Sequence, residues 1–263
     1  MARASVIGNP QPYRCFGTFA GLPFWPGGLT LVAAAPGVGK TSWLLRTVFE
    51  ALTAGFPAAL GCYEHTAEEL KYRLQLQTNA AVAGPHGEPD EVDVENLLAT
   101  GGETVLLALS SREDTIRAIE QILLEDYAFP EKGPAVLAVD YLQRIPMVGL
   151  TGLVPEDQRS GEAAAGLRDL ARKRGWAVIV ACALRGGHFR GANDLSALLG
   201  DERVSYEADR VLLAQRSGPV HPCGCVMLDV HTLKNRTGPA HIWQMGFWGE
   251  RFYPALEGEL DHP

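Results

Sequence analysis

The chain has 263 residues, of which 46% are hydrophobic and 21% are charged, and its formal net charge is −8. These values are typical of a globular protein with one large core or two small ones, and the negative charge argues against a surface coated uniformly with nucleic acid. No apolar run approaches the roughly 20 residues that a membrane-spanning helix needs, and no apolar segment follows Met1–Ser5 as a signal peptide would require.

The first 20 residues are polar and contain prolines, and we expect them to form an N-terminal arm ahead of one domain at residues 21–263. Glycines and prolines at residues 21–28 predict turns. An apolar strand then begins at Leu29, and a loop with glycine and proline separates it from an amphipathic helix that ends at Gly55.

The order strand, loop, helix at residues 29–46 is typical of a phosphate-binding loop. Glycines let backbone N–H groups curve around a phosphate, Lys40 would reach the β- and γ-phosphates, and Thr41 would hold Mg²⁺ at the helix N-terminus. Ala34 replaces the usual first glycine, which is acceptable if its backbone is not left-handed. A chance turn with a surface lysine is the alternative, but the flanking strand and helix favour the loop. The predicted nucleotide-binding residues are Ala35, Pro36, Gly37, Val38, Gly39, Lys40, Thr41 and Ser42.

Strands and helices continue to alternate along the chain. Apolar strands are predicted at residues 57–63, 104–109, 135–139 and 177–182, with helices between them. The predicted helix-capping groups are the pairs Thr66/Glu69 and Ser110/Glu113 and the single residue Ser160. Shorter strands follow at residues 210–214, 225–231 and 241–246. The pattern predicts an α/β fold with a mostly parallel sheet flanked by helices and antiparallel strands added near the C-terminus.

A carboxylate follows the apolar strand at residues 135–139. Asp140 stands at the end of this strand, where phosphate-loop proteins support Mg²⁺ beside the loop hydroxyl, here that of Thr41. An aspartate after a buried strand is more often a turn or cap residue. The phosphate loop upstream favours the metal site, so the sequence predicts ATP and Mg²⁺ as cofactors, with the metal held by Thr41 and Asp140.

Four motifs resemble those of the DnaB-type replicative helicases, which are hexameric motors of the RecA fold. Asp140-Tyr-Leu-Gln143 is similar to the family's Asp-Tyr-Leu-Gln signature, and Cys62–Leu74 resembles the segment that carries its catalytic glutamate. Ser205–Leu213 is similar to the family's strand with Glu-Gln-Asp-Ala-Asp, and Lys234–Pro239 to its Lys-Gln-Arg-Asn-Gly-Pro. The motifs occur in family order, and the resemblance spans residues 16–252.

The resemblance implies that residues 21–263 are a RecA-like ATPase domain that works as a hexamer and translocates on single-stranded DNA. It implies that Glu64 is the catalytic base and that Gln143 senses the γ-phosphate. It also implies that Arg236, with Lys234, is an arginine finger supplied to a neighbouring subunit. Each residue has a structural alternative: Glu64 and Gln143 as strand-end caps, and the basic pair as a solvated strand edge.

Two departures from the family pattern favour a rival hypothesis, in which the fold serves as a nucleotide-dependent switch or assembly protein without helicase activity. Cys182–Leu184 stands where the family has Ser-Gln-Leu. Leu199 and Glu202 replace the arginine and glycine of a DNA-contacting loop. The presence of Glu64 and Arg236 favours the motor.

A glycine-rich polar loop contains Arg185, His188 and Arg190, which we expect to contact DNA phosphates in a central channel. A disordered turn is the alternative. Helicases of the family carry a helical N-terminal collar that meets primase, and only a short arm precedes the motor here. The chain therefore resembles an isolated motor domain that lacks this collar, or the small plasmid-type hexameric helicases, and we do not expect primase contact.

The five cysteines have no disulfide-framework spacing, which indicates a reducing cytosol and hence a cytoplasmic protein. His221, Cys223, Cys225 and His231 also suggest a zinc site. The Cys-x-Cys spacing is too short for the usual zinc-ligand pair, and a hairpin turn is expected at this point, so we favour the turn.

Overall fold

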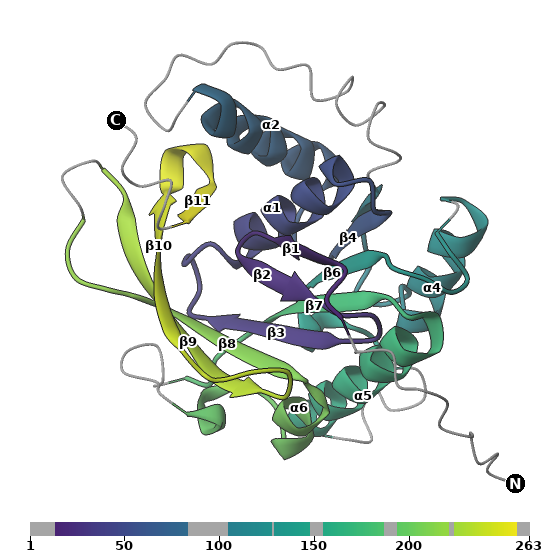
Figure 1. The fold of residues 1–263 in the computed structure, drawn as a ribbon. Coiled ribbons are helices and arrows are strands. Elements are labelled where there is room, and N and C mark those ends of the chain that lie inside the picture. The colour runs from purple at the N-terminus through teal and green to yellow at the C-terminus, as the bar shows by residue number, and fades with distance from the viewer. Residues whose placement is uncertain are drawn as a thin grey trace, which may run out of the picture.

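A nine-stranded sheet forms the centre of the molecule, whose computed structural model describes residues 14–83, 105–127, 129–147, 155–186, 194–220 and 224–256 (Figure 1). Within these residues, parallel strands follow one another in the order β8 (Arg210–Arg216), β3 (Leu29–Ala34), β7 (Ala177–Cys182), β6 (Val136–Asp140), β4 (Ala58–Cys62) and β5 (Val105–Ala108). Antiparallel strands extend the sheet beyond β8, in the order β9 (Val226–Asn235), β10 (Ile242–Trp248) and β11 (Tyr253–Leu256). The predicted mostly parallel sheet with antiparallel additions near the C-terminus is thus confirmed.

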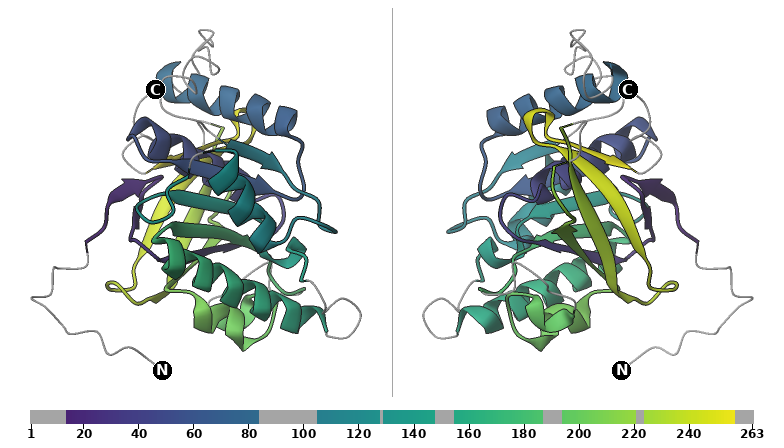
Figure 2. Two further views of the ribbon diagram at one scale, coloured as in Figure 1. Left: turned by 90° about the vertical axis from the view of Figure 1, so that its right-hand side faces the viewer. Right: turned by 90° about the vertical axis from the view of Figure 1, so that its left-hand side faces the viewer.

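Helices cover both faces of the sheet (Figures 1 and 2). On one face α1 (Lys40–Thr53) packs against the sheet and α2 (Ala67–Ala83) packs against α1, and both share an apolar cluster with Val32 of β3. On the other face α5 (Glu156–Arg174) packs against β3 and β7 and α4 (Ile116–Glu125) packs beside α5, and both share an apolar cluster with Leu31. Every residue of β3, β4, β6 and β7 is buried, which explains why these strands are continuous apolar runs without polar alternation.

A small antiparallel hairpin precedes β3 and consists of β1 (Gly17–Phe19) and β2 (Leu22–Phe24). Phe19 and Ala20 are buried, and the indole N–H of Trp43 donates to the carbonyl oxygen of Ala20 at 3.1 Å. Residues 17–20 therefore belong to the folded domain and not to the expected arm. Strands of three residues are too short to produce a hydrophobic period, so the sequence pattern gave no signal for them.

The predicted capping box at the start of α2 is confirmed. The Thr66 N–H donates to Glu69 Oε2 at 3.0 Å, and the Glu69 N–H donates to Thr66 Oγ1 at 3.2 Å. Each residue's backbone N–H group therefore finds its acceptor in the other residue's side chain, as in other capping boxes.

The other predicted caps are wrong. Thr115, not the Ser110/Glu113 pair, caps α4, because its Oγ1 accepts a backbone N–H from the first helical turn at 3.2 Å. Ser160 lies inside α5, which begins at Glu156. Its Oγ donates to the Glu156 carbonyl at 3.3 Å, which is the usual bond of a serine within a helix.

The remaining described elements are short or terminal. They are α6 (Glu202–Glu207) and the 3-10 turns η1 (Leu142–Arg144), η2 (Leu195–Ala197) and η3 (Gly249–Arg251). The late strands run further than predicted, and β11 had no sequence prediction. Across the part of the chain that the structure describes, no helix combines the length and apolarity needed to cross a membrane.

Candidate functional site

A cavity of about 520 Å³ opens where the parallel strands end. The loop after β3 and the residues that follow β4, β6 and β7 form its walls, which is where open α/β sheets bind ligands. The sequence-predicted residues that line it are Pro36, Gly37, Gly39, Lys40, Thr41, Ser42, Glu64 and Asp140. Ala35 and Val38 were also predicted to contact nucleotide, but their side chains pack into the apolar clusters beneath the loop.

The loop after β3 has the backbone that a phosphate requires. Gly37 and Gly39 have φ values of 74° and 104°, which L side chains rarely adopt. A Cβ on Gly39 would lie 2.8 Å from the ring of Phe247, so this position also lacks space for a side chain. Ala34 lies within β3, and its replacement of glycine therefore introduces no left-handed residue. No side chain caps the N-terminus of α1, and its first turn lines the cavity, so the N–H groups of this turn could bind an anion.

Lys40 is the cation at the phosphate loop. Its Nζ donates to the carbonyl oxygens of Ala34 at 2.9 Å and Ala35 at 3.2 Å. Burial lowers the pKa of Lys40, and the nearby carboxylate of Asp140 opposes this shift. A phosphate at the loop would supply the negative charge that favours the protonated amine.

Thr41 and Asp140 meet at the floor of the cavity. The Thr41 hydroxyl donates to Asp140 Oδ2 at 2.6 Å, and Asp140 is 1% exposed. A hydroxyl and a carboxylate are the hard oxygen donors that Mg²⁺ takes, with phosphate oxygens completing its shell. The two side chains thus fit the predicted metal, and among the described residues no group of three or more His, Cys, Asp or Glu side chains forms a separate metal site.

Glu64 reaches the same cavity from the next strand. It follows β4, whose last residue Cys62 pairs with Asp140 at the end of β6. The neighbouring parallel strands therefore present one exposed and one buried carboxylate to a common space. An exposed carboxylate that faces a phosphate site is suited to accept a proton from water.

Gln143 does not line the cavity, but it joins the strands beside it. Its Nε2 donates to the Leu199 carbonyl at 2.6 Å and to Cys182 Sγ at 3.3 Å, and its Oε1 accepts the Ala183 N–H at 3.1 Å. The non-family residues at 182 and 183 thus contact Gln143 through a thiol and a backbone N–H. The link between β6 and β7 does not require the family's serine and glutamine side chains.

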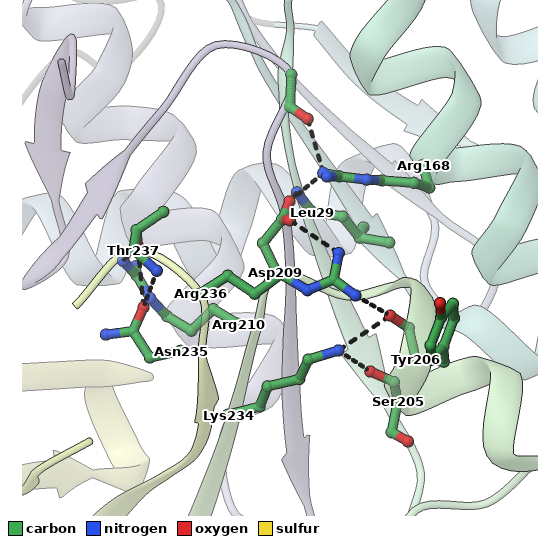
Figure 3. Close-up of polar contacts among 11 residues, drawn as sticks. Leu29, Arg168, Ser205, Tyr206, Asp209, Arg210, Lys234, Asn235, Arg236 and Thr237 are labelled. Carbon is green, nitrogen blue, oxygen red and sulfur yellow. Dashed lines mark hydrogen bonds and ion pairs between the residues drawn. The ribbon is translucent and has the colours of Figure 1, made fainter. Parts of the chain in front are cut away.

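Lys234 and Arg236 lie near the amino ends of the parallel strands, whereas the phosphate loop lies at their carboxyl ends. Asn235 pairs with Arg210 at the amino end of β8, whereas the phosphate loop follows the carboxyl end of β3. Lys234 Nζ donates to the carbonyls of Ser205 and Tyr206 at 2.7 and 2.9 Å, and Arg236 Nη2 donates to that of Tyr206 at 2.8 Å (Figure 3). The structure therefore does not bring these two residues to the Lys40 of their own chain.

Residues 19–252 match the sequence model of the DnaB-like helicase C terminal domain. The chain belongs to this family. Its structure is similar to a solved ATPase domain, with a TM-score of 0.68 and 17% sequence identity over 87% of this chain and 84% of that one. At this identity the likeness establishes the fold, which is that of a helicase ATPase domain. No curated protein sequence matches this DnaB-like chain.

A second similar structure is a DnaB-like replicative helicase described with its interactions with primase. Its TM-score is 0.70 and its identity 17%, over 88% of this chain and 57% of that chain. The DnaB-like domain thus corresponds to just over half of that protein. The expectation that primase contact is absent finds no support in this comparison. The family membership also does not favour the alternative of a switch or assembly protein.

One wall of the cavity in this DnaB-like domain was not predicted. It consists of Arg73 on α2 together with Phe247 and Phe252, which flank η3. The Arg73 guanidinium lies 4.7 Å from the centroid of the Phe252 ring. Flat cationic and aromatic surfaces of this kind suit a nucleobase. Arg73 lies in the family-like segment Cys62–Leu74 but was given no role there, whereas no local motif marks Phe247 and Phe252.

Arg185 is the described member of the predicted DNA-binding set. Its guanidinium pairs with Asp157 at 3.1 Å and also donates to the carbonyl of Gly200. The side chain is 38% exposed, so part of it remains open to solvent. His188 and Arg190 lie outside the described residues.

The zinc alternative also falls partly outside the described residues, because they omit His221 and Cys223. Cys225 is buried in a small apolar cluster with Trp248 and Tyr253. This environment explains the thiol as a packing residue.

Proposed function

We propose that this DnaB-like domain is an ATP-hydrolysing motor that assembles with copies of itself into a hexameric ring and translocates on single-stranded DNA in the cytoplasm. The main support for the proposal is the separation of the catalytic groups. Lys40 and Asp140 lie at the carboxyl ends of the parallel strands, and Arg236 lies near their amino ends. A head-to-tail ring places one edge of each subunit against the opposite edge of the next, and so completes every site.

Each group in the cavity has a distinct role in phosphoryl transfer. Lys40 binds the β- and γ-phosphates, and Thr41 and Asp140 would hold Mg²⁺, which when bound neutralises charge on the phosphate oxygens. Glu64 accepts the proton of the attacking water. Arg236 of the adjacent subunit, assisted by its lysine neighbour, stabilises the charge that develops on the transferred group.

Gln143 provides a connection from the phosphates toward DNA. Its amide contacts Ala183 and Leu199, which flank the segment Arg185–Arg190 on both sides. A γ-phosphate that attracts this amide would compete with the Leu199 carbonyl for its N–H group. We propose that this exchange links nucleotide state to DNA contact by the Arg185–Arg190 segment.

The test is the rate of ATP hydrolysis with and without single-stranded DNA, measured together with particle mass by light scattering. We expect a hexamer mass in the presence of ATP and a rate that rises with single-stranded DNA but not with duplex DNA. DNA binding should weaken steeply with salt, since it rests on phosphate contacts. A protomer mass under all conditions, with a rate indifferent to DNA, would favour the switch hypothesis.

Lys40→Ala supplies the control for this experiment. The variant removes the cation that balances the β/γ-phosphates, so binding of a labelled ATP analogue should be lost along with hydrolysis. Unchanged affinity for the analogue would show that nucleotide binds elsewhere.

A further inference from the structure

One carboxylate at the amino edge of the sheet joins three separate elements (Figure 3). Asp209 lies between α6 and β8, and its side chain is 15% exposed. Its Oδ2 accepts the Leu29 N–H at 2.9 Å and also pairs with Nη1 of Arg168. Its Oδ1 lies 3.6 Å from Nη1 of Arg236. The same aspartate therefore contacts the start of β3, the helix α5 and the predicted arginine finger.

The backbone reinforces this arrangement. The Arg236 N–H donates to the Asp209 carbonyl at 2.8 Å, and the Arg236 guanidinium also donates to the carbonyl of Tyr206 at the end of α6. The residue is thus fixed at both its main chain and its side chain. Such double attachment restricts where its charge can lie relative to β3.

The charges around the finger also favour the carboxylate. Arg168, Lys234 and Arg236 bring positive charges to this edge, and burial together with Arg236 lowers the pKa of Lys234. The carboxylates of Asp209 and Glu207 oppose that shift. The negative charge of Asp209 offsets the repulsion that Lys234, Arg236 and Arg168 exert on one another.

We propose that Asp209 is a positioning residue that holds Arg236 in the place from which it enters the ATP site of the neighbouring subunit. The proposal rests on the proposed function. In a head-to-tail ring the phosphate loop of each subunit faces one neighbour, and its arginine finger faces the other neighbour. Asp209 attaches the finger to β3, whose far end continues into the loop. These contacts of Asp209 therefore fix the position of the arginine finger relative to the phosphate loop of the same chain.

The first test is Asp209→Asn, which keeps the shape and the acceptor for the Leu29 N–H but removes the charge that faces Arg236. Nucleotide affinity should stay within about twofold of wild type, because the loop is untouched. The kcat should fall by up to about 10²-fold, the loss that an ångström of misplacement causes. Unchanged kcat would overturn the proposal. If the asparagine variant does not fold, Asp209→Glu keeps the charge while displacing it, and should lower kcat in the same way.

A double-variant cycle separates positioning from general stability. If Asp209 acts through Arg236, then adding Asp209→Asn to Arg236→Ala should cause no further loss of kcat. A full additional loss would show that Asp209 affects catalysis by another route. A wild-type rate for Arg236→Ala alone would instead refute the trans finger of the proposed function.

Arg168→Met is the matched control, because it removes the other ion pair of Asp209 and leaves Arg236 in place. This variant should lower the melting temperature, since Arg168 is buried and paired, but keep the wild-type kcat below that temperature. A loss of kcat equal to that of Asp209→Asn would mean that the aspartate serves only to hold the fold together.

Discussion

At the scale of single residues, a substitution of Glu64 should change the rate of ATP hydrolysis without changing the affinity for ATP. The variant Glu64→Gln retains the side-chain shape but cannot accept a proton. Hydrolysis should fall by about 10²–10⁴-fold, while affinity for ATP stays close to that of wild type. Steady-state kinetics and analogue titration measure the two effects separately.

Glu68→Gln is the control for this variant, because Glu68 is an exposed carboxylate in the first turn of α2 and does not line the cavity. It should leave the rate unchanged. Normal turnover by Glu64→Gln would place the catalytic base elsewhere.

Two buried thiols near the cavity predict a loss of stability in alkali. Burial raises the pKa values of Cys62 and Cys182 from 9.0 to about 11. The folded state then binds these protons more tightly than the unfolded state, so the stabilisation is complete below pH 9 and disappears as pH rises toward 11. Each unit of difference corresponds to roughly 1.4 kcal/mol.

Urea unfolding from mildly alkaline pH up to the raised pKa of the two thiols would measure this effect. The free energy of unfolding of the wild type should decline across the interval, and the variant with both Cys62→Ala and Cys182→Ala should decline less. The same decline in both proteins would mean that other groups cause it.

At the scale of secondary-structure elements, the start of α4 provides a test of the observed cap against the predicted one. Thr115→Ala removes the oxygen that accepts a backbone N–H of the first turn, and should cost about 1 kcal/mol of unfolding free energy. Ser110→Ala removes a more distant turn contact, with an Arg112 N–H at 3.3 Å, and should cost less. Chemical denaturation of the two variants decides between them, and the reverse order would restore Ser110 as the cap.

The same scale explains what the sequence could predict. The loop after β3, Asp140 and the parallel core follow from local patterns, because glycine conformations and fully apolar strands are properties of short segments. The position of Glu64 beside Asp140 can also be predicted, because the carboxyl ends of neighbouring parallel strands lie side by side. The positions of these residues could therefore be predicted from the sequence, and their roles in catalysis stay predictions.

Other features depend on contacts between distant segments. The Ser110/Glu113 spacing suits a capping box, but Asp114 instead accepts the Ser110 N–H at 2.6 Å and keeps this segment in a turn. The hairpin at residues 17–24 and the wall formed by Phe247 and Phe252 become defined only when they pack on α1 and α2. No local period or motif records such packing.

At the scale of the whole molecule, the two edges of the sheet predict complementation between defective subunits. Arg236→Ala should bind ATP but hydrolyse it about 10³–10⁵-fold more slowly. Mixing it with Lys40→Ala subunits should restore part of the activity, because some interfaces pair an intact loop with an intact finger. The ATPase rate of the mixture, compared with each variant alone, measures this.

Subunit exchange must be verified by native mass spectrometry of differently labelled chains. Mixed rings without activity, together with full hydrolysis by wild-type protomers, would disprove the trans assignment. A mixture of Lys40→Ala with Glu64→Gln is the control, since both defects lie at the same edge and no interface gains a complete site from the other partner.

The pair of strands β9 and β10 has a consequence for binding that follows from its length. Phe247, near the end of β10, touches the nucleotide loop at Gly39, while β9 ends next to Arg236. In the proposed ring, this pair of strands would lie against the nucleotide of its own chain and reach toward the nucleotide of a neighbour. Binding free energies that are coupled in this way are reciprocal. If one bound nucleotide changes the affinity of the neighbouring site by some factor, the second nucleotide changes the affinity of the first site by the same factor. We therefore expect the occupancies of neighbouring nucleotide sites in a ring to be correlated.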